Sequence, residues 1–301
     1  MNLGQHEARP HLNVDPGEFK RGFDREPFAF SHNLDSLDAF TFDSLRGLAQ
    51  RYADCPRDYF VSAGAPSADS DFFSVPNGQY GPHEAIERLD SGAVRILLKR
   101  PEDHDSRFRE ILEHLFAQVV GLRGGMGGEK LVRLESAIFI TSASATTPFH
   151  FDPEIAFFSQ IEGEKIYHMY SPAVLGESEL ERFYLQGLVS IGQIPLEGRD
   201  PRQEHVFSLR AGKGMHQPQN SPHWVETRAQ RSISYSFVFE TDATRAAGRT
   251  RAFNYYLRKV GVSPKHPGTR PALDALKAGS MRALIPMRQR AGRLLKAIRQ
   301  G

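Results

Sequence analysis

The sequence has almost no cysteine, since Cys55 is the only one in 301 residues. A single thiol excludes an internal disulfide and is typical of a reducing compartment, so we expect a cytoplasmic protein. No apolar run reaches the roughly 18 residues that a membrane-spanning helix needs. The N-terminal segment has no basic stretch followed by an apolar one, so we expect no secretory signal.

Several common catalytic motifs are missing as well. The chain has no phosphate-binding P-loop, no nucleophile elbow and no dinucleotide-binding glycine fingerprint. Glu154 and Glu164 lack the paired arrangement that acid–base hydrolysis requires. A content of 40% hydrophobic and 25% charged residues is ordinary for a globular protein. At 301 residues we expect one elaborated domain rather than two equal ones.

The most informative residues that are present are two histidines and one aspartate. His150 and Asp152 are two positions apart in a β-forming run, so both side chains point to one side of a strand. His223 follows 71 residues after Asp152. Two imidazoles and one carboxylate can hold a divalent iron on one triangular face and leave the opposite face open.

The segments around these residues are more specific than the three residues alone. The first reads TTPFHFDPE from Thr146, and the second reads SPHWV from Ser221. Both resemble the jumonji (JmjC) class of iron(II)- and 2-oxoglutarate-dependent oxygenases, in particular bacterial cupin-like members and the asparaginyl hydroxylase called factor inhibiting hypoxia-inducible factor. The resemblance implies Fe(II) ligands at His150, Asp152 and His223, with 2-oxoglutarate and O2 as co-substrates.

By the same resemblance, Lys165 and Thr147 bind the far carboxylate of 2-oxoglutarate. Taken alone, Lys165 is also compatible with a surface position, and Thr147 with capping a turn before Pro148. However, Lys165 shares one strand face with Tyr167 and Met169, which predicts that it points into a barrel. A buried ammonium group there needs an anionic partner.

Two positions depart from the family pattern. An asparagine expected six residues after the first ligand is Ala156, and a second one on the last core strand is Val238. These departures leave two alternatives open. One is a non-catalytic cupin-like metal-binding regulator or interaction module, and the other is a cupin enzyme that does not use 2-oxoglutarate.

Other aromatic residues near the motif are interpreted as structural. His216 and His168 are rival metal ligands, but we predict a hydrogen-bonded lining role for His216. His168 lies on the strand face opposite Lys165 and is predicted to pack in a core. Trp224 follows His223, faces the other way, and is predicted to support the ligand strand by packing.

The predicted fold is mainly β, a double-stranded β-helix (jelly-roll, cupin) core with flanking N-terminal helices and a C-terminal helical tail. Eight short β-type runs between residues 131 and 239, punctuated by glycine and proline, suit this fold. We predict three regions: an N-terminal arm and flank (1–125), the core (126–245) and a basic helical region (246–301). Within them we expect an extended arm (1–30), helices (37–52, capped at Asp43–Ser44; 83–89; 105–120), a buried strand (93–98) and an acidic insert (175–202).

The C-terminal region has an uneven charge. Residues 264–301 contain nine lysines or arginines and one acid, a net charge of +8, so the remainder carries 2 − 8 = −6. An apolar seam with 3-4-3-4 spacing predicts a helix packed on its own domain or on a twin subunit; it comprises Leu284, Met287, Ala291, Leu294 and Ile298. Pro286 is tolerable only near the first turn of that helix. Nucleic-acid binding is a less favoured alternative, because no aromatic residue follows Tyr256.

Together these features predict an Fe(II)- and 2-oxoglutarate-dependent dioxygenase that hydroxylates a protein or peptide side chain, or a small molecule. Demethylation of an N-methyl group uses the same chemistry and stays open. No catalytic residue is assigned beyond the metal ligands.

Overall fold

The computed structural model describes residues 9–64, 66–71, 80–90, 92–186 and 191–300. The chain divides into two compact units. The first comprises Met1–Gly127, Arg133–Pro172 and Gln193–Phe239, and the second Gly128–Val132, Ala173–Gly192 and Glu240–Gly301. No helix among the described residues is both long and apolar enough to cross a membrane.

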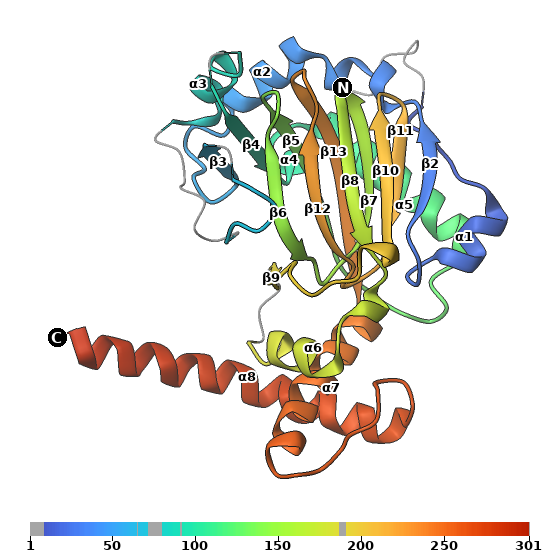
Figure 1. Ribbon diagram of the computed structural model, residues 1–301, viewed down its shortest axis with the longest axis vertical. Helices are drawn as coiled ribbons and strands as arrows, with labels where there is room; N and C mark the ends of the chain where they lie inside the picture. Colours follow the sequence, from blue (N-terminus) through green and yellow to red (C-terminus); the bar gives the residue numbers. More distant parts are fainter. Residues whose placement is uncertain (1–8, 65, 72–79, 91, 187–190, 301) are drawn as a thin grey trace. The chain divides into compact units, whose positions relative to one another are not determined.

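The strands are β1 (Leu12–Asn13), β2 (Phe28–His32), β3 (Tyr59–Ala63), β4 (Val94–Lys99), β5 (Leu131–Thr141), β6 (Thr146–Phe151), β7 (Ile155–Glu162), β8 (Glu164–Tyr170), β9 (Gly192–Gln193), β10 (Glu204–Arg210), β11 (Lys213–Gln217), β12 (Pro222–Thr227) and β13 (Ser232–Thr241). They form a larger sheet in the order β1-β2-β11-β7-β13-β5-β4-β3 and a smaller one in the order β10-β8-β12-β6-β9. The two sheets lie in layers, one in front of the other (Figure 1). The predicted mainly β jelly roll is therefore confirmed, and each of the eight predicted β runs is a strand.

Each face of the larger sheet has its own hydrophobic core. Strand alternation sends Phe157 toward the helices and Phe158 toward the smaller sheet. The helices of this unit are α1 (Pro16–Gly22), η1 (Leu34–Ser36), η2 (Asp38–Phe40), α2 (Phe42–Gln50), α3 (Pro82–Glu87), α4 (Pro101–His104), α5 (Ser106–Arg123) and η5 (Pro201–Gln203). The core between the sheets combines Phe158, Tyr167, Met169, Leu209, Met215 and Val225, so it surrounds the predicted site.

The prediction of an extended N-terminal arm is wrong over its described part. Pro16 stands in the first turn of α1, where its missing N–H costs nothing, and Asp15 caps the helix by accepting from the Glu18 N–H. Phe19 and Phe28 are buried, and β2 pairs with β11 in the larger sheet. The N-cap of α2 is Thr41 and not the predicted Asp43–Ser44, since the Ser44 N–H donates a hydrogen bond to Thr41 Oγ1.

The second unit is helical, with η4 (Pro172–Val174) at its boundary and α6 (Glu177–Tyr184), α7 (Asp242–Lys259) and α8 (Pro271–Gln300). The sequence did not predict α6, which lies in the acidic insert. α7 and α8 fall in the predicted C-terminal helical region (246–301), although α7 begins four residues earlier. Ion pairs join Arg251 to Glu177 and Arg258 to Glu181. The prediction for Pro286 is wrong, because it lies inside α8. The side chains of Ala291, Leu294 and Ile298 fall outside the described residues.

Candidate metal and co-substrate site

Neighbouring strands of the smaller sheet bring the two histidines together. His150 on β6 and His223 on β12 are register partners, and Asp152 follows directly after β6. His150 Nε2 lies 3.9 Å from Asp152 Oδ1, and His223 Nε2 lies 3.7 Å from Asp152 Oδ2. One ligand atom from each of the three residues lies within 4.8 Å of the other two. The sequence prediction that these residues meet is therefore correct.

The imidazoles are prepared for metal binding by their second nitrogens. His150 Nδ1–H donates to the Pro148 carbonyl at 2.7 Å, and His223 Nδ1–H donates to the Ser221 carbonyl at 3.0 Å. Both Nε2 lone pairs consequently face the carboxylate. Burial lowers the pKa of His150 to about 3 and also lowers that of His223, so both rings stay neutral at physiological pH. This donor set fits a divalent iron with an open face.

Asp152 is oriented by a glutamine that the sequence analysis missed. Gln217 Nε2 donates to Asp152 Oδ2 at 3.1 Å, and the Tyr167 hydroxyl donates to Gln217 Oε1 at 3.3 Å. Gln217 on β11 is the register partner of Ala156 on β7, and Val238 on β13 is the partner of Ala156 on its other side. An amide group is thus present on the strand next to Ala156, one of the two positions where a family asparagine is replaced.

Lys165 points into the space between the sheets, as predicted. Its side chain is buried, and its Nζ lies 5.6 Å from the ring centre of Phe139 and 5.5 Å from that of Phe158. Burial, with a further contribution from the positive charge of Arg95, lowers the pKa of Lys165 to about 7. Two aromatic faces compensate only part of the cost of burying the ammonium group, so the site favours an anionic ligand.

Thr147 reaches the same interior through a β-bulge. It is three residues before His150, a spacing that places two side chains on opposite faces of a regular strand. Between the pairs His150–His223 and Thr147–Val225 the register shifts, so that Thr147 lies beside the inward-facing Val225. The half-buried Thr147 therefore lies at a strand level between that of the histidines and that of Lys165, on the face of Val225.

The remaining aromatic predictions are partly correct. His216 is buried and hydrogen-bonded to the Ala156 carbonyl and the Asp24 N–H, but it faces Phe28 and Phe157 and does not line the interior. His168 lies opposite Lys165 as predicted. However, it is half-buried on the outer surface of the smaller sheet and does not lie in a core. There its ring stacks on that of Trp224, with ring centres 3.8 Å apart. Trp224 packs behind the ligand strand as predicted.

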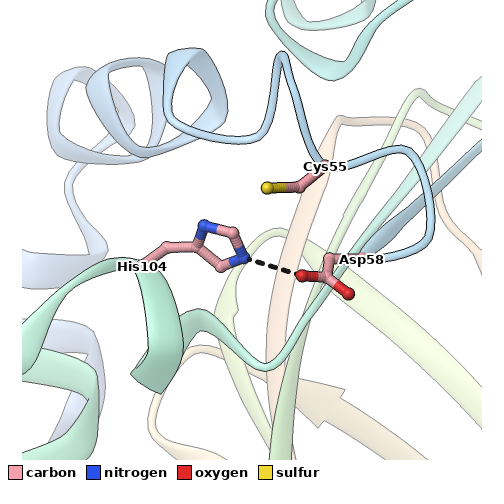
Figure 2. Close-up of side chains that lie close together, drawn as sticks. All are labelled: Cys55, Asp58 and His104. Carbon is pink, nitrogen blue, oxygen red and sulfur yellow. Dashed lines mark hydrogen bonds and ion pairs between the residues drawn. The ribbon is translucent and has the colours of Figure 1, made fainter.

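Cys55, Asp58 and His104 form a second group of metal-ligating side chains (Figure 2). Its ligand atoms lie within 4.8 Å of one another, and His104 Nε2 lies 3.3 Å from Asp58 Oδ2. Asp58 already forms an ion pair with Arg100, and the His104 ring stacks on Tyr52 at 3.8 Å. Because its carboxylate is neutralised and its imidazole is packed, we assign this group to structural support.

Comparisons with known proteins give a consistent picture of the fold. No protein-family profile matches the sequence. Ribosomal oxygenase 2 from Bos taurus is 30% identical over 130 residues, which are 43% of this chain and 22% of that protein. The chain therefore spans about a fifth of the length of this curated relative.

Solved structures of the Escherichia coli protein YcfD share the architecture. One superposes with a TM-score of 0.53 at 16% identity and covers 91% of this chain and 68% of that chain. A second, named a ribosomal oxygenase and solved with cobalt and 2-oxoglutarate, has a TM-score of 0.51 at 16% identity and covers 91% and 67%. These likenesses establish that the chain shares the fold of YcfD. The nearer resemblance to the asparaginyl hydroxylase stays a prediction.

Proposed function

We propose that this chain is an Fe(II)- and 2-oxoglutarate-dependent oxygenase that hydroxylates a side chain of a protein or peptide. In this proposal, His150, Asp152 and His223 bind the iron. The observation that carries it is the convergence of both Nε2 atoms on the Asp152 carboxylate, at 3.9 and 3.7 Å, while both Nδ1 atoms are committed to backbone carbonyls. Such a set leaves one face of a metal ion open for a chelating co-substrate.

The bound iron, with 2-oxoglutarate and O2, supplies the oxidising chemistry for a C–H bond. The protein supplies geometry. Gln217 holds the carboxylate of Asp152, while Lys165 and Thr147 bind the far carboxylate of 2-oxoglutarate. Aromatic and aliphatic side chains of the interior core exclude water from this space. Two neutral imidazoles and one carboxylate leave an Fe(II) site with a net positive charge, which a dianionic co-substrate complements.

Product analysis tests this proposal. The Fe(II)-loaded protein, given 2-oxoglutarate, O2 and a panel of peptides, should form succinate together with one added oxygen atom on a peptide. Asp152→Ala should abolish both products, because the metal loses its only anionic ligand. Asp43→Ala is the matched control, since the Asp43 side chain is 91% exposed. Succinate formation that survives Asp152→Ala would contradict the proposal.

The substrate class rests on the names of the relatives. Two are called ribosomal oxygenases, so ribosomal proteins are the first peptides to test. A small molecule is the alternative substrate. Demethylation is recognised by formaldehyde release and loss of a methyl group instead of a gain of oxygen.

A non-catalytic metal-binding regulator is the second candidate function, and Ala156 and Val238 favour it. Metal and 2-oxoglutarate binding without succinate formation over the whole panel would support this candidate. A cupin enzyme that does not use 2-oxoglutarate would keep its activity in Lys165→Ala.

We further propose a cytoplasmic homodimer that associates through α8. This helix exposes three large apolar side chains, Leu276 (67% exposed), Leu284 (50%) and Met287 (65%). A cluster of exposed apolar side chains is typical of a surface that another protein covers. The double variant Leu276→Glu and Leu284→Glu should elute as a monomer in size-exclusion chromatography. An unchanged elution volume would contradict the dimer, and salt-sensitive RNA binding would favour the nucleic-acid alternative.

A further inference from the structure

One layer of the jelly-roll interior is unusually polar. Ser62 on β3 pairs with Arg95 on β4, and Arg95 pairs with Thr141 on β5. The Thr141 hydroxyl lies 3.2 Å from that of Thr227 on β12, which pairs with Lys165 on β8. These five residues are called the polar belt below. It crosses from the larger sheet to the smaller one at the level of Lys165.

The orientation of the belt follows from strand alternation. Phe139 faces Lys165 from β5, and Thr141 is two residues further along the same strand, so Thr141 faces the same interior. Register partners on adjacent strands share a face, which places Arg95 and Ser62 on that interior side as well.

Arg95 brings a second positive charge to this layer. Within the described part of the chain, no hydrogen bond or ion pair joins Arg95 or Lys165 to another side chain. Burial lowers the pKa of Arg95 to about 10, and its charge contributes to the lowered pKa values of both Lys165 and His150. Arg95 therefore acts electrostatically on His150 and on Lys165 together.

Ser62 adds an unused donor beside Arg95. Its side chain is 1% exposed, and its hydroxyl has no hydrogen-bond partner among the described residues. A buried hydroxyl without a partner is uncommon in native proteins, and it leaves Ser62 a donor to offer to a ligand. Two cations and one free hydroxyl on the same interior layer are the complement of a carboxylate.

We propose that Arg95 is a second anion-binding residue of this site, which together with Lys165 and the Ser62 hydroxyl binds the far carboxylate of the co-substrate. The inference rests on the proposed function for the identity of that co-substrate. It makes the pocket selective for dicarboxylates, because a monocarboxylate keto acid leaves the buried Lys165 and the half-buried Arg95 without a counter-charge. Neither Arg95 nor Ser62 belongs to the motif segments that carry the family resemblance.

Direct binding tests this assignment without turnover. Calorimetric titrations of the whole 301-residue chain would use 2-oxoglutarate with the Mn(II)-loaded form and glutarate with the metal-free form. Arg95→Leu should weaken both ligands at least tenfold, since a charge-assisted hydrogen bond is lost. Arg95→Lys should recover part of the affinity, and Ser62→Ala should weaken binding severalfold.

The matched control is Arg210→Leu on β10, because the Arg210 side chain is 75% exposed. This variant should bind both ligands with the affinity of wild type. Selectivity gives a second measurement for any variant that folds poorly. The preference of wild type for 2-oxoglutarate over 2-oxobutyrate should shrink at least tenfold in Arg95→Leu and by a smaller factor in Arg95→Lys. Binding of 2-oxoglutarate by Arg95→Leu within twofold of wild type overturns the inference, as does a wild type that binds neither dicarboxylate. Tight, Arg95-dependent binding without succinate formation supports the inference while contradicting the proposed function.

Discussion

Replacing Lys165 by methionine should stabilise the ligand-free protein while removing its response to 2-oxoglutarate. The ammonium group is buried between Phe139 and Phe158, and its pKa is lowered from an ordinary 10.5 to about 7, first by burial and then by Arg95. Methionine has a similar length and carries no charge, so it fills the same space without the desolvation cost.

The magnitude follows from the difference in pKa. A fall from 10.5 to about 7 corresponds to roughly 4 kcal/mol of unfolding free energy at pH 7, where the folded state is about half protonated. Loss of two weak cation–π contacts offsets roughly 1 to 2 kcal/mol of this. We therefore expect Lys165→Met to raise the unfolding free energy by about 2 to 3 kcal/mol. Because the folded pKa lies below the unfolded one, the penalty is fully present below about pH 7 and disappears toward pH 10.5.

Urea unfolding at pH 7, with and without 2-oxoglutarate, measures both effects. Wild type should be stabilised by the ligand, and Lys165→Met should start from a higher stability and show no ligand response. Lys213→Met, at an exposed position on β11, should change neither quantity. A less stable Lys165→Met, or one that still responds to 2-oxoglutarate, would refute the reasoning.

Three further predictions concern the same unit. Gln217→Leu removes the amide that holds Asp152, so metal affinity should fall on the order of tenfold in a chelator competition, and an unchanged affinity would argue against this orienting role. Affinity for 2-oxoglutarate should fall as pH rises above 7, by at most about tenfold per pH unit, because Lys165 loses its proton. In calorimetry, Lys165→Arg should flatten this pH profile. A flat profile in wild type would contradict a role of the Lys165 charge in binding. The double variant His150→Ala and His223→Ala should retain no bound iron or zinc by elemental analysis, whereas one equivalent retained would point to the group around Cys55.

The jelly roll and the pair His150 and Asp152 were accessible from the sequence because their signals are local, whereas His223 was added through the family resemblance. Alternation of period two reveals each strand, and a spacing of two places His150 and Asp152 on one side. The inward direction of Lys165 also follows from its neighbours Tyr167 and Met169. These inferences need no knowledge of which strand lies beside which.

The missed features depend on pairing between distant segments. Gln217 orients Asp152 only because β11 lies in register with β7, which brings Gln217 beside Ala156. The sequence predicted a buried strand around Arg95, but the face on which Arg95 points depends on its partner Thr141. The N-terminal strand β2 was missed because its contribution is to extend a sheet edge, and its proline-containing surroundings are typical of a loop.

The visible spectrum of the anaerobic Fe(II)-loaded protein tests the central claim most directly. On addition of 2-oxoglutarate, wild type should develop a weak charge-transfer band, because the co-substrate chelates an iron that keeps one face open. His223→Ala should not develop it. Absence of the band in iron-loaded wild type, or its persistence in His223→Ala, would contradict the account.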